Sequence, residues 1–211
     1  MTLKLNGSSS GYTAIDAPAA AGSNTLTLPT GNGNNKEVLQ TNGSGVLSWV
    51  KPGTVLQIVS NTQTGNFSNS VATTTAWSPS ELETTITPTA TSSKVLIQGH
   101  FCVDAAISMG MSVQLQHTGG GGTLVTGANA AVAGPRKTVH SACKTSGERM
   151  VNLPVHFLDS PNTASAITYK FWFFHTSGST RTLYINQSHE DTNHAEISRA
   201  VSTITLTEIA G

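Results

Sequence analysis

The sequence predicts an all-β protein: an antiparallel, jelly-roll-like β-sandwich preceded by an extended, little-packed N-terminal module. Two observations support this. From Thr54 onward, apolar and polar residues alternate with a period of two, as in half-buried antiparallel strands. The chain also lacks the sustained i, i+3, i+4, i+7 apolar spacing of an amphipathic helix. Roughly eight or nine strands over about 150 residues fit a two-sheet sandwich, whose strand order the pattern does not define.

The first predicted domain, residues 1–53, is a shaft or anchoring module. It is polar and punctuated by Gly and Asn, and its apolar residues come in twos and threes between turn clusters. These small groups are Leu26 and Leu28, Val38 and Leu39, and Val46, Leu47 and Trp49. Such pieces cannot bury enough surface in a lone chain to offset the entropy of ordering them. The segment is therefore either a disordered arm or a module ordered by neighbouring chains.

The second predicted domain, residues 54–211, is the sandwich head. Alternation is clearest in five stretches, 95–103, 111–115, 151–157, 167–173 and 204–206. Clusters of Gly, Pro, Asn and Ser separate the strands and favour turns. The one helical start signal, at 78–81, is sufficient for a single turn. The strand at 171–174 is apolar on both faces, so we expect either a loop or another subunit to cover its second face.

Composition excludes several classes of function. Charged residues make up 10% of the chain, the formal net charge is +0, and Lys and Arg form no cluster. Nucleic-acid binding needs several basic side chains on one surface, so no nucleic-acid partner is expected. No apolar run is long enough for membrane insertion, and the first six residues lack the apolar region of a signal peptide. We therefore expect synthesis in the cytosol, with Cys102 and Cys143 as free thiols.

Several phrases of the sequence resemble one protein family. The stretches 17–18, 22–29 and 38–49 resemble the shaft-proximal module of fibre-type virion proteins of tailed phages, especially aquatic ones. Five further stretches resemble the β-sandwich head of the same proteins: 56–60, 86–97, 157–161, 167–170 and 202–211. The resemblance implies a homotrimer in the virion, assembled in the host cytoplasm, and favours another subunit as the cover for the second face of the strand at 171–174. It also implies contacts with other capsid or tail proteins through the N-terminal module, and with glycans or proteins of the host surface.

Residues capable of chemistry are present but form no recognised motif. His189, Glu190, Asp191, His194 and Glu196 could approach a cation, yet a polar loop explains them equally well, and we expect no metal or other cofactor. The Gly run at 119–122 precedes a strand rather than a helix, which indicates a hairpin tip and not a phosphate loop. Trp77, Trp172 and Tyr184 could stack on sugars, but each fits a core or interface position. Binding residues therefore remain unassigned.

We also expect no enzymatic activity. The chain has no Gly-x-Ser-x-Gly nucleophile elbow, and His140 and Cys143 are three positions apart near a turn. Asp159 with Glu190 or Asp191 could form an acid pair, but Asp159 precedes Ser-Pro and fits an Asx turn.

These observations favour a structural virion appendage, a tail- or head-fibre protein displayed for host-surface adhesion. The alternative is a capsid decoration or cement protein that stabilises the shell. A carbohydrate-degrading fibre enzyme is a third candidate, disfavoured because the long β-helix repeat of such enzymes is missing.

Overall fold

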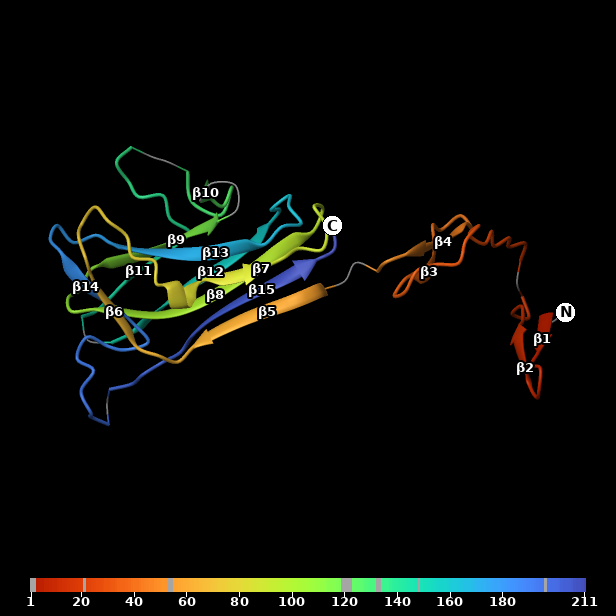
Figure 1. The fold of residues 1–211 in the computed structure, drawn as a ribbon, viewed down its shortest axis with the longest axis horizontal. Coiled ribbons are helices and arrows are strands. Elements are labelled where there is room, and N and C mark those ends of the chain that lie inside the picture. The colour runs from red at the N-terminus through yellow and green to blue at the C-terminus, as the bar shows by residue number, and fades with distance from the viewer. Residues whose placement is uncertain are drawn as a thin grey trace. The chain divides into compact units, whose positions relative to one another are not determined.

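The computed structural model describes residues 3–20, 22–52, 55–118, 123–131, 134–147, 149–195 and 197–211. Its regular elements are β-strands and one 3₁₀ turn, η1 (Ser80–Leu82) (Figure 1). The chain divides into two compact units, Met1–Pro52 and Gly53–Gly211. We call the first the N-terminal unit and the second the head.

The N-terminal unit contains two antiparallel hairpins. Strand β1 (Leu3–Asn6) pairs with β2 (Tyr12–Ile15), and β3 (Val38–Thr41) pairs with β4 (Leu47–Val50). An isolated parallel bridge joins Thr27 to Val46, beside the turn of the second hairpin.

The turn of the second hairpin depends on a glycine. Gly45 has a φ of +83°, and a Cβ added there would lie 2.3 Å from the carbonyl oxygen of Thr25. Only glycine accommodates both this backbone conformation and this close approach. Nearby, the Trp49 indole donates a hydrogen bond to the Gly31 carbonyl at 2.8 Å and packs against Gly33.

One sheet of the head has six strands, all paired antiparallel. Its central strand, β8, pairs with β12 along one edge, while β15 and β14 follow one another along the other edge. The outermost strands are β5, paired with β15, and β6, paired with β14. The bounds are β5 (Val55–Gln63), β6 (Phe67–Val71), β8 (Lys94–Ala105), β12 (Val151–Asp159), β14 (Arg181–Ile185) and β15 (Ser202–Ile209).

The other sheet has five strands, also antiparallel. Strand β9 pairs with β13 on one side and with β11 and β10 on the other, and β7 pairs with the far edge of β13. The bounds are β7 (Thr84–Ile86), β9 (Gly110–Thr118), β10 (Thr123–Leu124), β11 (Ser141–Lys144) and β13 (Ile167–His175). The two sheets form the layers of the sandwich (Figure 1).

The core lies between these layers and is built from the inward-facing residues of each strand. Phe101 of β8 packs between Phe171 and Phe173 of β13, with ring centroids 4.7 and 5.3 Å apart. All three rings are at most 1% exposed. Such tilted and edge-on aromatic contacts add to the gain from burying apolar area. These three rings are therefore one of the contacts that join the two sheets within a larger apolar core.

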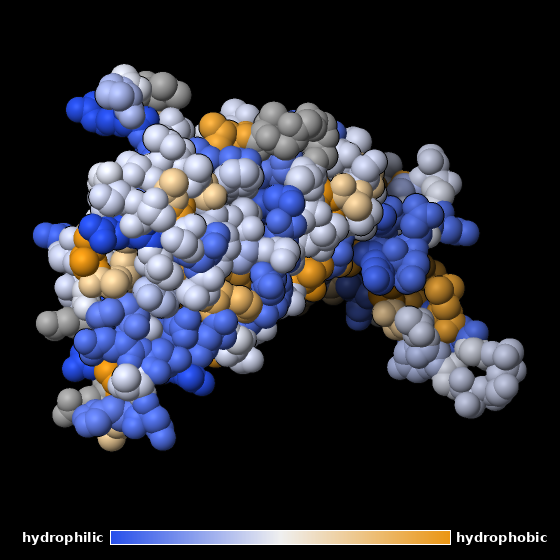
Figure 2. Space-filling view, turned by 60° about the vertical axis from the view of Figure 1, so that its left-hand side comes forward, coloured by the Kyte–Doolittle hydropathy of each residue, from blue (hydrophilic) through white to orange (hydrophobic). Residues whose placement is uncertain are grey.

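The predicted all-β, antiparallel, jelly-roll-like sandwich is confirmed. The head has more strands than the eight or nine predicted, eleven in its described residues, because short strands such as β7, β10 and β11 give too little alternation to detect. The predicted turn at 78–81 is present as η1. On the face shown in Figure 2, blue and pale residues dominate and orange, apolar residues are scattered.

The second face of β13 contacts a loop of the same chain. Trp172 and Phe174 point away from the core but are only partly exposed. The Lys137 ammonium lies 4.6 Å from the centre of the Phe174 ring, and Gln114, opposite Trp172 in the register, donates a hydrogen bond to the Thr138 carbonyl. A loop thus contacts part of this face, and its coverage by another subunit stays a prediction.

Candidate functional site

The N-terminal unit has formed strands but no core. Among residues 3–20 and 22–52, no side chain is buried. Ten large apolar side chains there are substantially exposed, up to 69% for Leu28: Leu3, Leu5, Tyr12, Ile15, Leu26, Leu28, Val38, Leu39, Val46 and Trp49. Soluble monomers rarely expose so much apolar surface in so short a segment, and such patches typically mark interaction sites.

The register places much of this apolar surface on one side of each hairpin. In the first hairpin, Leu3 lies opposite Ile15, and Leu5 shares their face because residues two apart on a strand point the same way. In the second hairpin, Leu39 lies opposite Trp49. A two-stranded hairpin is marginally stable in water unless its apolar face is covered. The N-terminal unit therefore has surfaces built to be covered.

The head carries a second exposed apolar surface, on the outer face of the six-stranded sheet. The registers place Leu158, Leu96, Thr207 and Ile58 in one row across β12, β8, β15 and β5. At the ends of the row Ile58 is 62% exposed and Leu158 46%, whereas Leu96 is partly exposed and Thr207 only 9%. Because the row has no charged member and ends on β5, an edge strand, it suits contact with another chain.

His140 and Cys143 do not form a reactive pair. The His140 ring contacts the Ala128 carbonyl through Nδ1, at 2.5 Å, and its Nε2 accepts the His156 backbone N–H, at 3.2 Å. Cys143 is partly buried against the core, and burial raises the pKa of its thiol. Burial also raises the pKa of Cys102, so neither sulfur is an activated thiolate. The two cysteines are free, as predicted.

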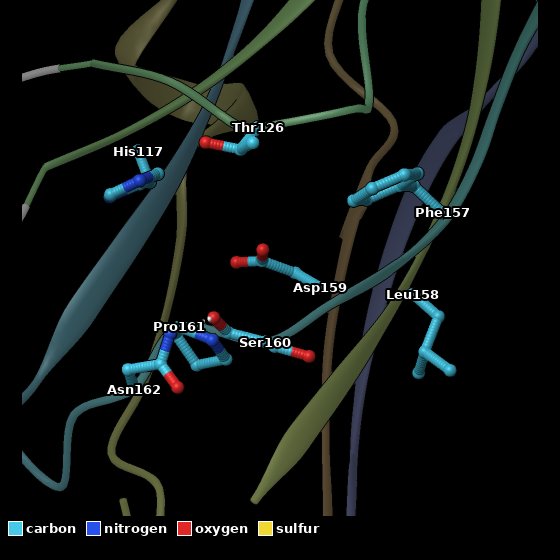
Figure 3. Close-up of a pocket in the computed structure, with 8 residues that line it drawn as sticks. All are labelled: His117, Thr126, Phe157, Leu158, Asp159, Ser160, Pro161 and Asn162. Atoms are coloured by element: carbon cyan, nitrogen blue, oxygen red, sulfur yellow. Dashed lines mark hydrogen bonds between the residues drawn. The ribbon is translucent and has the colours of Figure 1, made fainter.

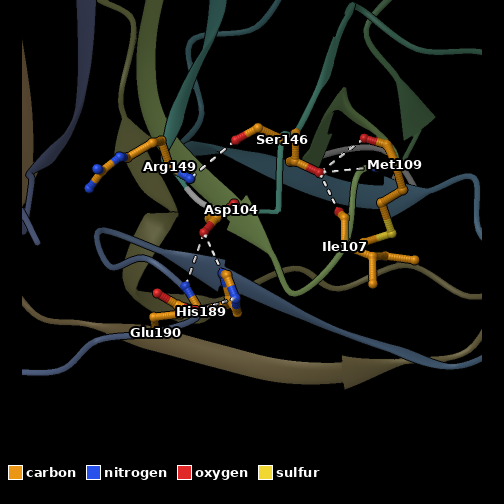
Figure 4. Close-up of polar contacts among 8 residues, drawn as sticks. Asp104, Ile107, Met109, Ser146, Arg149, His189 and Glu190 are labelled. Atoms are coloured by element: carbon orange, nitrogen blue, oxygen red, sulfur yellow. Dashed lines mark hydrogen bonds and ion pairs between the residues drawn. The ribbon is translucent and has the colours of Figure 1, made fainter.

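The histidine-rich loop is fastened to the head by a buried carboxylate. Asp104, fully buried at the end of β8, accepts the His189 backbone N–H at 3.0 Å, and its Oδ2 lies 3.3 Å from the His189 ring (Figure 4). On its other side the His189 ring lies 3.7 Å from Glu190. No group of three His, Cys, Asp or Glu side chains suited to a metal occurs among the described residues, which exclude Glu196.

The three candidate acids do not meet. Asp159 lies opposite Val95 at the start of β8, whereas the loop with Glu190 and Asp191 is tied to Asp104 near its end. Val95 and Asp104 are nine residues apart, which is about 30 Å along a strand. This far exceeds the separation of two glycosidase carboxylates. The Asx turn predicted for Asp159 was also wrong, because its carboxylate accepts a hydrogen bond from Tyr169 instead.

The three aromatic candidates for sugar stacking have structural contacts. Trp77 bridges to Phe173 and packs against the core, and Trp172 is partly exposed on the outer face of β13, opposite Gln114 in the register. Tyr184 is partly buried in β14, opposite Asp104 and Ser68.

The predicted hairpin tip at 119–122 lies outside the described residues. Sequence reasoning missed the apolar row, because only the strand registers bring Ile58, Leu96 and Leu158 together.

No protein-family model and no curated protein sequence matches the chain. Solved structures similar to the chain include three from infectious bursal disease virus. The Gx strain structure has a TM-score of 0.41 and 10% identity, covering 77% of this chain and 42% of that one. The VP2 subviral particle has a TM-score of 0.40 and 11% identity, covering 78% and 40%. The Gt strain structure has a TM-score of 0.41 and 10% identity, covering 98% and 46%.

This chain thus spans less than half the length of those viral chains. With so low an overlap, the likeness establishes neither a family nor a function. In the part of the chain that the structure describes, no helix is long and apolar enough to cross a membrane.

Proposed function

We propose that this chain is a structural protein of a phage virion, a tail- or head-fibre appendage whose head is displayed for host-surface adhesion. The observation that carries the proposal is the N-terminal unit, where ordered hairpins hold no buried side chain in residues 3–20 and 22–52. A segment of this kind gains its order from partners, because it cannot bury enough surface alone. The resemblance of 22–29 and 38–49 to fibre modules supports the same function.

We propose two kinds of partner for the exposed apolar surfaces. The first is the chain itself, as a homotrimer in which the hairpin faces of Leu3, Leu5 and Ile15 pack together. The row from Ile58 to Leu158 would form a separate contact between the heads. The second is a capsid or tail protein that holds the N-terminal unit on the particle. Obligate interfaces resemble a domain core cut in half, which is the character of these faces.

Labelling of virions tests this function. Antibodies against the head, visualised with gold by electron microscopy, should mark fibres at the tail or the head of the particle. Uniform label over the shell would instead indicate a decoration protein. Absence of the protein from purified particles would overturn the proposal.

A matched pair of variants tests the attachment surface. Leu3→Ser, Leu5→Ser and Ile15→Ser together remove the apolar face of the first hairpin and should abolish incorporation into particles. Lys4→Ser with Asn6→Ser alters the opposite face of the same strand and should leave incorporation unchanged. Equal incorporation of both variants would show that neither trimer formation nor attachment to the particle needs this face.

A further inference from the structure

A pocket opens on the head where β12 ends. It has a volume of about 460 Å³, within the range of small-molecule sites. Phe157 and Asp159 line it from β12, His117 from the end of β9, and Thr126, Ser160 and Asn162 from adjoining loops (Figure 3). The Asp159 carboxylate points into the space between His117, Thr126 and Phe157 (Figure 3). Segments far apart in the sequence thus converge on one acidic group.

The carboxylate is held in a fixed orientation. Asp159 is 7% exposed, and its Oδ2 accepts a hydrogen bond of 2.7 Å from the Tyr169 hydroxyl. Burial of Tyr169, followed by the hydrogen bond to Asp159 and its charge, raises the pKa of the phenol well above its usual value. Tyr169 therefore remains a donor and orients Asp159, whose other oxygen, Oδ1, accepts no hydrogen bond from the described residues. A carboxylate fixed in this way is preorganised to accept hydrogen bonds from a ligand.

The remaining lining selects the chemistry of the ligand. Phe157 is partly buried against the core, and the phenyl ring supplies a rigid apolar surface. Thr126, Ser160 and Asn162, exposed at the rim, offer hydroxyl and amide groups. The negative charge of Asp159 disfavours phosphate, sulfate and other anions. Asp159 and His117 are the two members of the lining that could ligate a metal, and no group of three His, Cys, Asp or Glu side chains suited to a cation occurs among the described residues. A neutral ligand rich in hydroxyl donors, with an apolar face for the ring, fits these groups.

We propose that this pocket binds a neutral sugar residue, whose hydroxyls donate to Asp159 while its C–H face packs on Phe157. The assignment deepens the proposed function, on which it rests, by giving the host-surface glycan a location on the head. The sequence did not predict this site, because Asp159 was interpreted as a turn residue. Its hydrogen-bond partner, Tyr169, lies on the next long strand, and only the folded structure brings the two together.

Titration of the full-length chain with single sugars tests the site. Glucose, galactose, mannose and N-acetylglucosamine are added separately, with N-acetylneuraminic acid as the anionic control and free lysine as the cationic one. Saturation-transfer NMR and amide shift changes are the readouts. We expect at least one neutral sugar to bind with a dissociation constant of millimolar order, as a ligand of this size allows. N-acetylneuraminic acid should bind at least about tenfold more weakly, because its carboxylate meets Asp159.

Three variants define the result. Asp159→Asn keeps the shape and an acceptor for Tyr169, and should weaken sugar binding at least about tenfold because the charge-assisted hydrogen bonds are lost. Asp191→Asn, which removes a partly exposed carboxylate that pairs with Arg199 outside the pocket, is the matched control and should bind sugar normally. If Asp159→Asn fails to fold, Thr126→Arg at the exposed rim should block the pocket without touching the core.

The outcomes separate this proposal from the proposed function. Failure of every neutral sugar to bind, unchanged binding by both pocket variants, or preference for lysine would each overturn the sugar site. The gold label on virions would still report the structural role. Conversely, sugar binding by a protein absent from particles would uphold the pocket and refute the appendage.

Discussion

Deletion of residues 1–52 should leave the head almost as stable as before. Every buried side chain of the core lies between Val71 and Leu206, so the deletion removes none of them. Changes outside a core typically alter the free energy of unfolding by no more than about 0.5 kcal/mol. In a domain of this size, 1 kcal/mol corresponds to a shift in Tm of about 2–4 °C. The expected shift in Tm is therefore at most about 2 °C.

Phe101→Ala provides the scale for this comparison. Removing that fully buried ring should cost about 3–5 kcal/mol, which corresponds to a drop in Tm of about 6–20 °C. Thermal melts followed by circular dichroism, at two protein concentrations, measure both changes and expose any part of the stability that depends on assembly. A deletion that lowers Tm as much as Phe101→Ala would refute the reasoning. The N-terminal strands would then contribute to the core stability of the head.

Three further predictions concern buried polar groups of the head. Burial alone would raise the pKa of Glu208, but the hydrogen bonds that its carboxylate accepts, including those from Gln57 and Thr89, outweigh burial and lower the pKa. Glu208→Gln should therefore lower the free energy of unfolding by about 1–3 kcal/mol at pH 7, as measured by urea titration. The difference in stability between wild type and Glu208→Gln should shrink as the pH falls below about 4.5 and through the lowered pKa of Glu208 in the folded state, because wild-type Glu208 then loses its charge too. A difference in stability that does not change with pH would contradict the lowered pKa of Glu208. The pKa of Tyr169 is raised in the folded head, so its contribution to the free energy of unfolding should be complete below pH about 10 and should decline above that pH. The Tyr169→Phe variant should lose less stability than wild type above pH about 10, because only its other titratable groups respond. Cys102 and Cys143 should react with iodoacetamide at pH 7.5 far more slowly in the folded head than in urea, and equal rates would show that they are accessible.

The sequence was most informative where alternation was long. Strands β8, β12 and β13 run for nine residues or more, and each has one inward face that the period-two pattern predicts. Strand β9 shows the limit of this reasoning. Ser112 and Gln114 occupy its polar positions and were expected to face solvent, yet both are buried, because the chain crosses over that face near Thr138. Coverage by a distant loop leaves no local pattern.

The polar sites were less predictable for the same reason. The hydrogen bond between Asp159 and Tyr169 joins two successive long strands, and that between Asp104 and His189 joins residues 85 positions apart. Residue types alone suggested a turn for Asp159 and a possible cation site at His189. The long-range partner decided the role in both cases. The N-terminal unit is the reverse case, since its lack of a core could be inferred directly from its sparse apolar residues.

Hydrogen exchange of the N-terminal unit tests the central claim most directly, namely that other chains order residues 3–50. Exchange is followed by mass spectrometry in assembled wild-type protein and in the Leu3→Ser, Leu5→Ser, Ile15→Ser variant. The amides of β1 to β4 should be protected only in the assembled protein, while those of β8 and β13 should exchange equally slowly in both. Equal protection of β1 to β4 in an isolated 21.9 kDa monomer would contradict the claim.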